Sequence, residues 1–347
     1  MISLVILNWN SGPFLARVLA SIEGQTSRNH ELIVVDNAST NDSLDVIREF
    51  VRRGVVTTFV QLGENRGFAG GMNAGIECAK GDYVIPLNSD ACLAPNFVET
   101  IERWHAERAA TSPTVGMLAV RLYDWDFSED TDVLTERVQV EGVTLMRRLA
   151  ICPWTSGTDP ETALLGPSGS VPIISRAALD AAVALSGFAY DPSYFAYVED
   201  VDLFIRLQSI GFSCEVLPGT RVWHIGSGSQ EQNRNLHHKP MRLQRLAHMN
   251  KWRTWRKIGS ARTRLEMLPW MIVDDLLRIV HGPARRELAG HYWRNLSSLR
   301  TTGSQRYPET PLQFGGTLFS RSIWRETARR WRRRLAPARS YRQGTTP

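Results

Sequence analysis

The sequence predicts an α/β fold, in which a mostly parallel, Rossmann-like central sheet is flanked by helices and followed by a helical C-terminal extension. Two observations lead to this fold class. Apolar runs alternate with helical patterns through residues 1–120, as they do in doubly wound sheets. From about residue 230 onward, the pattern is helical and rich in tryptophan and arginine.

Four near-continuous apolar runs predict the strands of the first half, because parallel strands are usually covered on both faces. We expect these strands at Ile2–Leu7, Glu31–Val35, Val55–Leu62 and Asp82–Leu87. The segments between and after them fit helices at Pro13–Gln25, Asp42–Arg53, Gly70–Ala79 and Asn96–Arg108.

The second half begins with a change of character. Acidic residues cluster at 124–132 and loop-forming residues follow, so we expect an insertion over the sheet edge at residues 124–162. Beyond it, the patterns predict strands at Ser170–Ile174 and Ser213–Leu217, and helices at Arg176–Leu185 and Glu199–Ile210.

The composition indicates a globular protein in a reducing compartment. Of the 347 residues, 43% are hydrophobic, which argues against disorder. The cysteines are widely spaced without a Cys-x-x-Cys pair, so we expect buried thiols instead of disulfides or zinc ligands. The first residues run directly into a strand, without the basic start of a cleavable signal. Residues 265–280 are apolar but contain a proline and two aspartates, too charged and too short for a membrane span. The expected location is cytoplasmic.

Charge divides the chain at about residue 230. Residues 1–229 carry 16 basic and 28 acidic side chains, a net charge of −12, whereas residues 230–347 carry 25 and 7, a net charge of +18. A basic segment attracts anionic lipid headgroups or nucleic acid. Its cations and tryptophans interleave at Lys251–Lys257, which favours a membrane surface, with a helical cap packed on the body as the alternative. No nucleic-acid recognition motif is present and the body is acidic, so no nucleic-acid partner is expected.

Polar residues follow several predicted strands at their carboxyl ends, where ligands bind in open α/β sheets. Asn8, Asp36 and Asn65 are in this position, as are Asn88 to Asp90. Asp36 can accept a hydrogen bond from a pyrimidine N3–H or a ribose hydroxyl. An aspartate that only shapes the turn or caps the helix is the alternative, and it is favoured for this motif in isolation.

A glycine-dense loop opens the third helix. In Gly63–Asn73, backbone N–H groups can approach a nucleotide, and Arg66 and Asn73 can add donors. The loop is neither a Walker loop nor a Gly-x-Gly-x-x-Gly fingerprint. A plain strand-to-helix connection is an equal alternative.

Four acidic or imidazole side chains complete the candidate chemistry. Asp90 is a possible ligand for a hard divalent cation, with diphosphate oxygens, waters and one further side chain filling the octahedron. His224 would be that further ligand, favouring Mn²⁺ with Mg²⁺ also possible. Glu199 and Asp200 open a helix, so they either complement its dipole or supply a general base at Asp200. Glu199 would raise the basicity of Asp200 and the helix N-terminus would lower it, which leaves the balance open.

In this order, the motifs resemble the family 2 glycosyltransferases, which are inverting enzymes of GT-A fold, and especially their rhamnosyltransferase-like branch. The match is carried by residues 5–10, 34–40, 65–73, 87–90, 166–176 and 194–203 and by His224, and it extends over about residues 1–257. It implies a catalytic domain at 1–229, with a nucleotide-sugar half (about 1–120) and an acceptor half (about 121–229), before the extension at 230–347.

The resemblance also implies roles for these residues. Asp200 would be the catalytic base, and Asp90 and His224 would hold Mn²⁺ or Mg²⁺. The nucleotide-sugar site would contain Asn8, Asp36, Asn65, Arg66, Gly67, Asn73 and Asn88, and the acceptor side Gly169, Ser170 and Glu199. Asn88 departs from the family pattern, because many relatives have aspartate there.

The implied reaction moves a sugar from a nucleoside-diphosphate sugar to a hydroxyl of a glycan or polyprenyl-diphosphate-linked acceptor, in cell-surface polysaccharide synthesis. The favoured donor is dTDP-rhamnose, followed by UDP-galactofuranose or a UDP-hexose. The enzyme would be peripheral at the inner face of the cell membrane. A catalytically inactive relative that binds nucleotide sugars is an alternative. A nucleotidyltransferase is disfavoured, because residues 8–13 after the first strand contain no cation.

Overall fold

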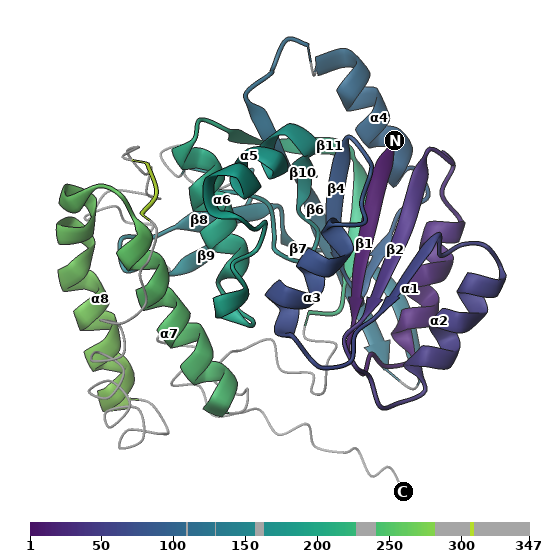
Figure 1. The fold of residues 1–347 in the computed structure, drawn as a ribbon, viewed down its shortest axis with the longest axis horizontal. Coiled ribbons are helices and arrows are strands. Elements are labelled where there is room, and N and C mark those ends of the chain that lie inside the picture. The colour runs from purple at the N-terminus through teal and green to yellow at the C-terminus, as the bar shows by residue number, and fades with distance from the viewer. Residues whose placement is uncertain (109, 129, 157–162, 227–240, 282–305, 309–347) are drawn as a thin grey trace, which may run out of the picture.

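A curled central sheet organises the protein in the computed structural model, which describes residues 1–108, 110–128, 130–156, 163–226, 241–281 and 306–308 (Figure 1). Nine strands of these described residues form one sheet in the order β3-β2-β1-β4-β10-β6-β11-β5, with β7 paired to β6. Helices cover both of its faces, and the α/β class predicted from the sequence is confirmed.

The first half of the sheet is parallel. Its strands are β1 (Ile2–Asn8), β2 (His30–Asp36), β3 (Thr58–Gln61) and β4 (Tyr83–Asn88). The helices that connect or follow them are α1 (Phe14–Glu23), α2 (Ser43–Arg52), α3 (Gly67–Ile76) and α4 (Phe97–Arg108). The register pairs Asn8 with Asp36 and Leu7 with Asn88. The polar strand ends therefore meet at one edge of the sheet.

The second half mixes strand directions. It contains β5 (Ala91–Leu93), β6 (Val115–Ser128), β7 (Thr131–Val140), β10 (Ile173–Ser175) and β11 (Ser213–His224). Strand β11 is parallel to β6, whereas β10, β5 and β7 are antiparallel to their neighbours. The expected insertion is thus partly a long β6–β7 hairpin that continues the sheet. A second small sheet pairs β8 (Gly142–Leu145) with β9 (Ile151–Trp154).

Alternation along the strands divides the core between the two faces of the sheet. Leu4 and Ile6 pack with α1, α2 and α4, whereas Val5 faces the other side. That second side holds α3, α5 (Arg176–Ser186) and α6 (Glu199–Ser209), which follows the short 3₁₀ helix η1 (Pro192–Tyr194). Strands β1, β2 and β4 are almost entirely buried, as expected for strands covered on both faces.

Two described helices belong to the basic extension. They are α7 (Met241–Lys257) and α8 (Ala261–His281), which lie side by side at the left of Figure 1. Met267 and Met271 of α8 join the second core cluster. No helix within the described residues combines the length and apolarity needed to cross a membrane. Residues 282–305 and 309–347, which carry much of the positive charge, lie outside the described part.

Candidate active site

The strand ends of β1 and β2 are joined by a buried polar cluster. Asn8 Nδ2 lies within hydrogen-bonding distance of Asp36 Oδ1 (2.8 Å), Ser39 Oγ (3.0 Å) and Ser43 Oγ (2.9 Å). The second oxygen of Asp36 accepts from the backbone N–H of Ser39 (3.1 Å). Asn8 and Asp36 are fully buried. These contacts agree with the turn-shaping alternative for Asp36, and direct contact of either residue with a nucleotide stays a prediction.

The glycine-dense loop is held from the neighbouring β2–α2 turn. Asn65 Oδ1 accepts from the N–H of Gly67 (2.8 Å) and from Asn37 Nδ2 (3.0 Å), and Asn37 Oδ1 accepts from the N–H of Arg66 (2.8 Å). Gly67 has a φ of +70°, and a β-carbon there would overlap Phe195. The Arg66 side chain is exposed at the entrance to α3. Asn37 therefore organises this loop, although the sequence had offered only the adjacent Asp36 as a functional residue.

Asn73 connects this loop region to the second half of the chain. Its Nδ2 donates to the carbonyl of Tyr190 (2.7 Å), and its Oδ1 accepts from the N–H of Tyr190 (2.9 Å). The structure thus gives the Asn73 amide an internal partner. Its predicted place in the donor site is adjacent to this contact and stays a prediction.

Asp90 and His224, which are far apart in the sequence, lie together. Strand β11 pairs with β5 so that His224 is opposite Ala91, and His224 Nε2 lies 3.3 Å from Asp90 Oδ1. Gln139 Nε2 donates to Asp124 Oδ1 (3.1 Å), which directs Gln139 Oε1 to His224 Nδ1 (2.9 Å). Because that oxygen accepts a hydrogen bond, Nδ1 is the donor, and Nε2 is the ring nitrogen that would present a lone pair to a cation. Nε2 makes no hydrogen bond with the described residues.

This pair fits a divalent cation that takes its remaining ligands from elsewhere. A buried carboxylate and an imidazole lone pair face the same point, and both are ligands that Mn²⁺ accepts. Among the described residues, no group of three or more histidine, cysteine or acidic side chains forms a complete metal site. Diphosphate oxygens and water would therefore have to complete the coordination.

The loop containing Gly169 and Ser170, which the sequence predicts on the acceptor side, contacts both the end of β4 and the acidic start of α6. The N–H of Asn88 donates to the carbonyl of Ser170 (2.9 Å). A β-carbon at Gly169 would overlap the carboxylate of Asp200, so only glycine allows this close approach. The predicted residues Asn88, Gly169, Ser170 and Asp200 therefore lie in one continuous neighbourhood.

Burial decides the electrostatics of the Glu199–Asp200 pair. It raises the pKa of Glu199 to about 8, and repulsion from Asp200 adds to the increase. Burial also raises the pKa of Asp200, against the backbone N–H of Val201, which donates to Asp200 Oδ1 (2.8 Å). Desolvation thus outweighs the backbone donors at the start of α6, whereas the sequence had weighed only Glu199 against the helix N-terminus. The raised pKa favours the protonated form of Glu199, next to Asp200, whose pKa is raised as well.

The backbone that leads into this pair is strained. Phe195, Tyr197 and Val198 have φ values of 60°, 69° and 72°. Such conformations cost non-glycine residues about 1–3 kcal/mol each, and they persist where the surroundings enforce them. No glycine marks this segment, so the sequence offered no signal for it.

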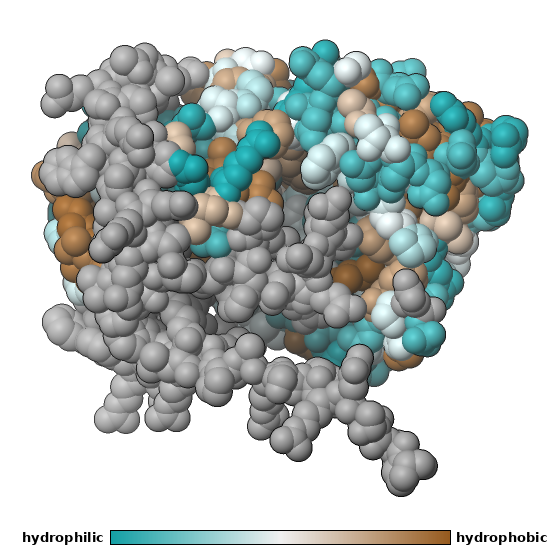
Figure 2. Space-filling model, turned by 90° about the horizontal axis from the view of Figure 1, so that it is seen from below, coloured by the Kyte–Doolittle hydropathy of each residue, from teal (hydrophilic) through white to brown (hydrophobic). Residues whose placement is uncertain are grey.

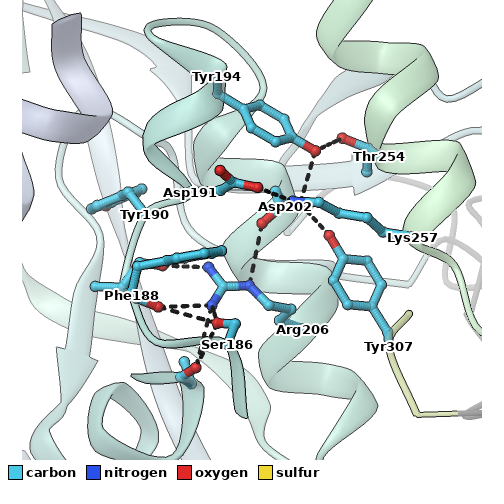
Figure 3. Close-up of polar contacts among 12 residues, drawn as sticks. Ser186, Phe188, Tyr190, Asp191, Tyr194, Asp202, Arg206, Thr254, Lys257 and Tyr307 are labelled. Carbon is cyan, nitrogen blue, oxygen red and sulfur yellow. Dashed lines mark hydrogen bonds and ion pairs between the residues drawn. The ribbon is translucent and has the colours of Figure 1, made fainter. Parts of the chain in front are cut away.

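A buried charge cluster ties α6 to the extension (Figure 3). Asp202 accepts from Lys257 Nζ (2.8 Å), Tyr194 Oη (2.8 Å) and Arg206 Nε (3.2 Å), and also from Tyr307 Oη. Lys257 also pairs with Asp191. In the same segment of interleaved cations and tryptophans, Lys251–Lys257, Lys251 Nζ donates to Asp274 (2.9 Å) and Trp252 Nε1 donates to Asp275 (2.8 Å). The expectation that Lys251–Lys257 presents its cations to lipid is wrong for these two lysines, because both are buried against acidic partners.

Comparisons with known proteins agree with this architecture. Residues 3–122 match the model of glycosyl transferase family 2. The chain is 29% identical over 149 residues to an uncharacterized glycosyltransferase of Nostoc sp., a match that covers 43% of this chain and 44% of that protein. It is 27% identical over 251 residues to the N-acetylglucosaminyl-diphospho-decaprenol L-rhamnosyltransferase of Mycobacterium tuberculosis, covering 65% of this chain and 76% of that protein.

The chain spans less than half the length of the first curated relatives that it matches. Among solved structures, GalNAc-T7 with UDP, GalNAc and Mn²⁺ superposes with a TM-score of 0.57 at 16% identity, covering 86% of this chain and 57% of that one. Identity this low shows a shared fold alone. Residues 3–122 are therefore similar to glycosyl transferase family 2, and the described residues share the GT-A fold.

Proposed function

We propose that the protein transfers a sugar with inversion from a nucleoside-diphosphate sugar to a hydroxyl of a glycan or lipid-linked glycan, with Asp200 as the general base. The observation that carries this proposal is the place of Asp200. Its carboxylate lies against Gly169, in the loop that bonds the end of β4, and burial raises its pKa. A base of raised pKa at the carboxyl edge of the sheet suits removal of a hydroxyl proton.

The step is a single displacement. The acceptor oxygen attacks the anomeric carbon while its proton passes to Asp200, and the bond between that carbon and the diphosphate oxygen breaks. Inversion follows because attack and departure occur on opposite faces of the sugar. Glu199, protonated at neutral pH, adds no second negative charge beside the base.

Asp90 and His224 are the residues that would hold Mn²⁺ or Mg²⁺. The lone pair on His224 Nε2 and the neighbouring Asp90 carboxylate support this assignment. When bound there, the cation would neutralise charge on the departing diphosphate. Asn88, Asn65 and Arg66 are proposed to contact the donor, because they surround the same edge without being fully buried.

The proposed donor is dTDP-rhamnose, with UDP-galactofuranose or a UDP-hexose next. The named activity of the mycobacterial relative supports rhamnose and a polyprenyl-diphosphate-linked acceptor. The test is a panel of nucleotide sugars, scored by thermal stabilisation with and without Mn²⁺. We expect the strongest Mn²⁺-dependent shift with dTDP-rhamnose, and loss of that shift in Asp90→Ala.

Turnover is then measured with dTDP-rhamnose and decaprenyl-diphosphate N-acetylglucosamine. Asp200→Asn should abolish transfer while the thermal shift persists, because the base acts on the acceptor and not on the donor. Retained turnover in Asp200→Asn would remove the base assignment. Donor binding by the wild type without turnover on any acceptor tested would favour the inactive relative.

We also propose that α8 brings the enzyme to the inner membrane surface. Leu265, Ile272, Val273 and Leu276 are exposed on α8, whereas its two aspartates face α7. Figure 2 shows apolar residues at its left edge, on the side where Figure 1 places α8. An aliphatic outer face joined to a segment of net charge +18 suits an anionic bilayer.

Flotation with phosphatidylglycerol-containing vesicles tests this surface. The wild type should float with them and not with phosphatidylcholine vesicles, and Leu265→Glu/Leu276→Glu should reduce flotation several-fold. Val133→Glu, at an exposed apolar position on β7, is the matched control. Unchanged flotation of the double variant, or a dimer of the wild type that the variant disrupts, would contradict membrane docking by this face.

A further inference from the structure

The segment between η1 and α6 is held by a side chain of the extension. Asn250, in α7, is fully buried, and its Nδ2 lies within hydrogen-bonding distance of three backbone carbonyls. These belong to Tyr194 (2.8 Å), Ala196 (3.0 Å) and Tyr197 (2.8 Å). One amide nitrogen thus bridges most of the strained segment that precedes Glu199.

The orientation of this amide is settled by its other end. Asn250 Oδ1 accepts from Arg253 Nη1 (3.1 Å), and a guanidinium can only donate. The nitrogen must therefore face the carbonyls. Its two hydrogens are shared among the three oxygens, which draws those carbonyls toward one point.

Carbonyls that converge in this way require an unusual backbone. The carbonyl oxygens of Tyr194, Ala196 and Tyr197 face Asn250 of α7. Positive φ values occur in the same segment, at Phe195, Tyr197 and Val198. Val198 is the most demanding of them, because a β-branched side chain is rarely found in that region. It is also the residue that immediately precedes α6, and within the described residues its side chain provides no cap for that helix.

The opposite side of the segment is attached to the donor half. The carbonyl of Phe195 accepts from the N–H of Ala69 in α3 (3.1 Å). The segment is therefore held between the helix that follows the glycine-dense loop and the first helix of the extension. Asp200 lies three residues after Tyr197, the last residue of this double attachment, so its position depends on both contacts.

We propose that Asn250 is a positioning residue for the transfer reaction: it holds residues 195–198 in the geometry that places the Asp200 carboxylate against Gly169. This inference rests on the proposed function of Asp200. Because Asn250 is fully buried, its effect would pass through residues 195–198. Removal of its amide lets the segment relax, which displaces the base. Asn250 bonds the segment at Tyr194, Ala196 and Tyr197, whereas the attachment to the donor half, from Phe195 to Ala69, does not involve it.

The test compares Asn250→Ala with a control variant, Lys251→Met, at the neighbouring position on α7. Lys251→Met removes buried ion pairs with α8 and destabilises the extension without touching residues 195–198. Both variants are assayed with dTDP-rhamnose, Mn²⁺ and decaprenyl-diphosphate N-acetylglucosamine, at temperatures matched to their unfolding midpoints. Asn250→Ala should lower kcat by about a hundredfold, the effect of misplacing a catalytic group by about 1 Å, with the KM for the donor unchanged. Lys251→Met should keep its kcat.

Glycine rescue separates positioning from stability. Val198→Gly accepts positive φ without strain, so it should restore part of the kcat of Asn250→Ala. In an Asp200→Asn background, Asn250→Ala should lower the residual rate no further, because it acts through the missing base. If Asn250→Ala does not fold, Asn250→Ser, which keeps one donor, replaces it in every comparison.

Two results would overturn the inference: equal losses of kcat in Asn250→Ala and Lys251→Met, or no recovery with Val198→Gly. Failure of the proposed function has a different signature. In that case Asp200→Asn turns over as fast as the wild type, whatever Asn250→Ala does.

Discussion

Replacing Asp202 by asparagine should destabilise the protein more than any exposed charge change. Asp202 is fully buried and faces the two cations Arg206 and Lys257. Asparagine keeps the size of the side chain and removes the charge, so the result measures electrostatics without a cavity. With Asp191 as the remaining carboxylate, the cluster changes from two cations and two anions to a net positive charge.

The magnitude follows from the burial of the cluster. Removing one member of a buried ion pair costs about 3–5 kcal/mol, because the remaining charge is desolvated without compensation. For a chain of 347 residues, that loss should lower the thermal midpoint by roughly 4–7 °C. Exposed pairs are worth at most about 1 kcal/mol. Asp126→Asn, which breaks the exposed pair with Arg137 on the β6–β7 hairpin, is therefore the matched control.

Urea unfolding of a double-mutant cycle checks the reasoning. Lys257→Met alone leaves an excess anion, whereas Asp202→Asn/Lys257→Met restores charge balance between Asp191 and Arg206. The double variant should therefore be more stable than the sum of the single losses predicts, by at least about 1 kcal/mol. Additive losses, or a loss below about 1 kcal/mol for Asp202→Asn alone, would refute the electrostatic account.

Three further predictions concern the site. The pKa of Glu199 rises to about 8 on folding, so this carboxyl binds more protons in the folded chain than in the unfolded one. Its contribution to stability is therefore complete below about pH 4.3 and is lost as the pH rises toward 8. Glu199→Gln should flatten this decline in urea titrations at pH 5, 7 and 9, and an unchanged slope would exclude Glu199 as its source. Gln139→Leu should weaken Mn²⁺ binding about tenfold in calorimetric titrations, because His224 loses the acceptor that sets its tautomer; unaltered affinity would count against that role. Gly169→Ala should reduce kcat and spare the donor-induced thermal shift, since the new methyl group displaces Asp200; full activity would show that the contact is dispensable.

The parallel half of the sheet could be predicted because strands that are buried on both faces appear in the sequence as continuous apolar runs. Continuous apolar runs located β1, β2 and β4 to within a residue or two at each end. The run at Val55–Leu62 was too long, since β3 begins only at Thr58 and pairs on one side with β2. An edge strand needs fewer bonded residues, so apolar content alone does not define its start.

The antiparallel part was harder to predict, because its stabilising pairs lie across strands. The acidic residues at 124–132 suggested a solvated insertion, yet Arg137 pairs with Asp126 across the β6–β7 hairpin. Strand β11 was expected to stop at Leu217, before Pro218 and Gly219. It continues to His224 with a register shift between Leu217 and Val222. That continuation delivers the imidazole to Asp90, a result that no local pattern contains.

Residues of the candidate site could be proposed from the sequence where the side chain itself is acidic or an imidazole. They could not be proposed where the role depends on a contact with a distant segment. Asp200 and His224 were identified as chemistry-bearing groups, whereas Gln139 and Asn250 were not, because their roles exist only through contacts with remote segments. Lys257 is the instructive case. Its neighbours in sequence indicate a basic surface segment. In the fold, however, Lys257 is buried, and its ammonium group bonds Asp202 of α6.

The step in net charge and the contacts between helices place the end of the catalytic part of the chain at different positions. The step in net charge at residue 230 predicts a boundary between an acidic domain and a basic extension, and that boundary stays a prediction. Helix α6, however, carries both Asp200 and, two residues further on, Asp202. Asp202 forms an ion pair with Lys257 of α7. The strained segment before α6 bonds Asn250 of the same α7. The helix that presents the proposed base is therefore anchored by two residues from beyond the charge boundary. For this reason we infer that α7 belongs to the catalytic unit, and that the surface charge of the extension serves a separate purpose from its buried contacts.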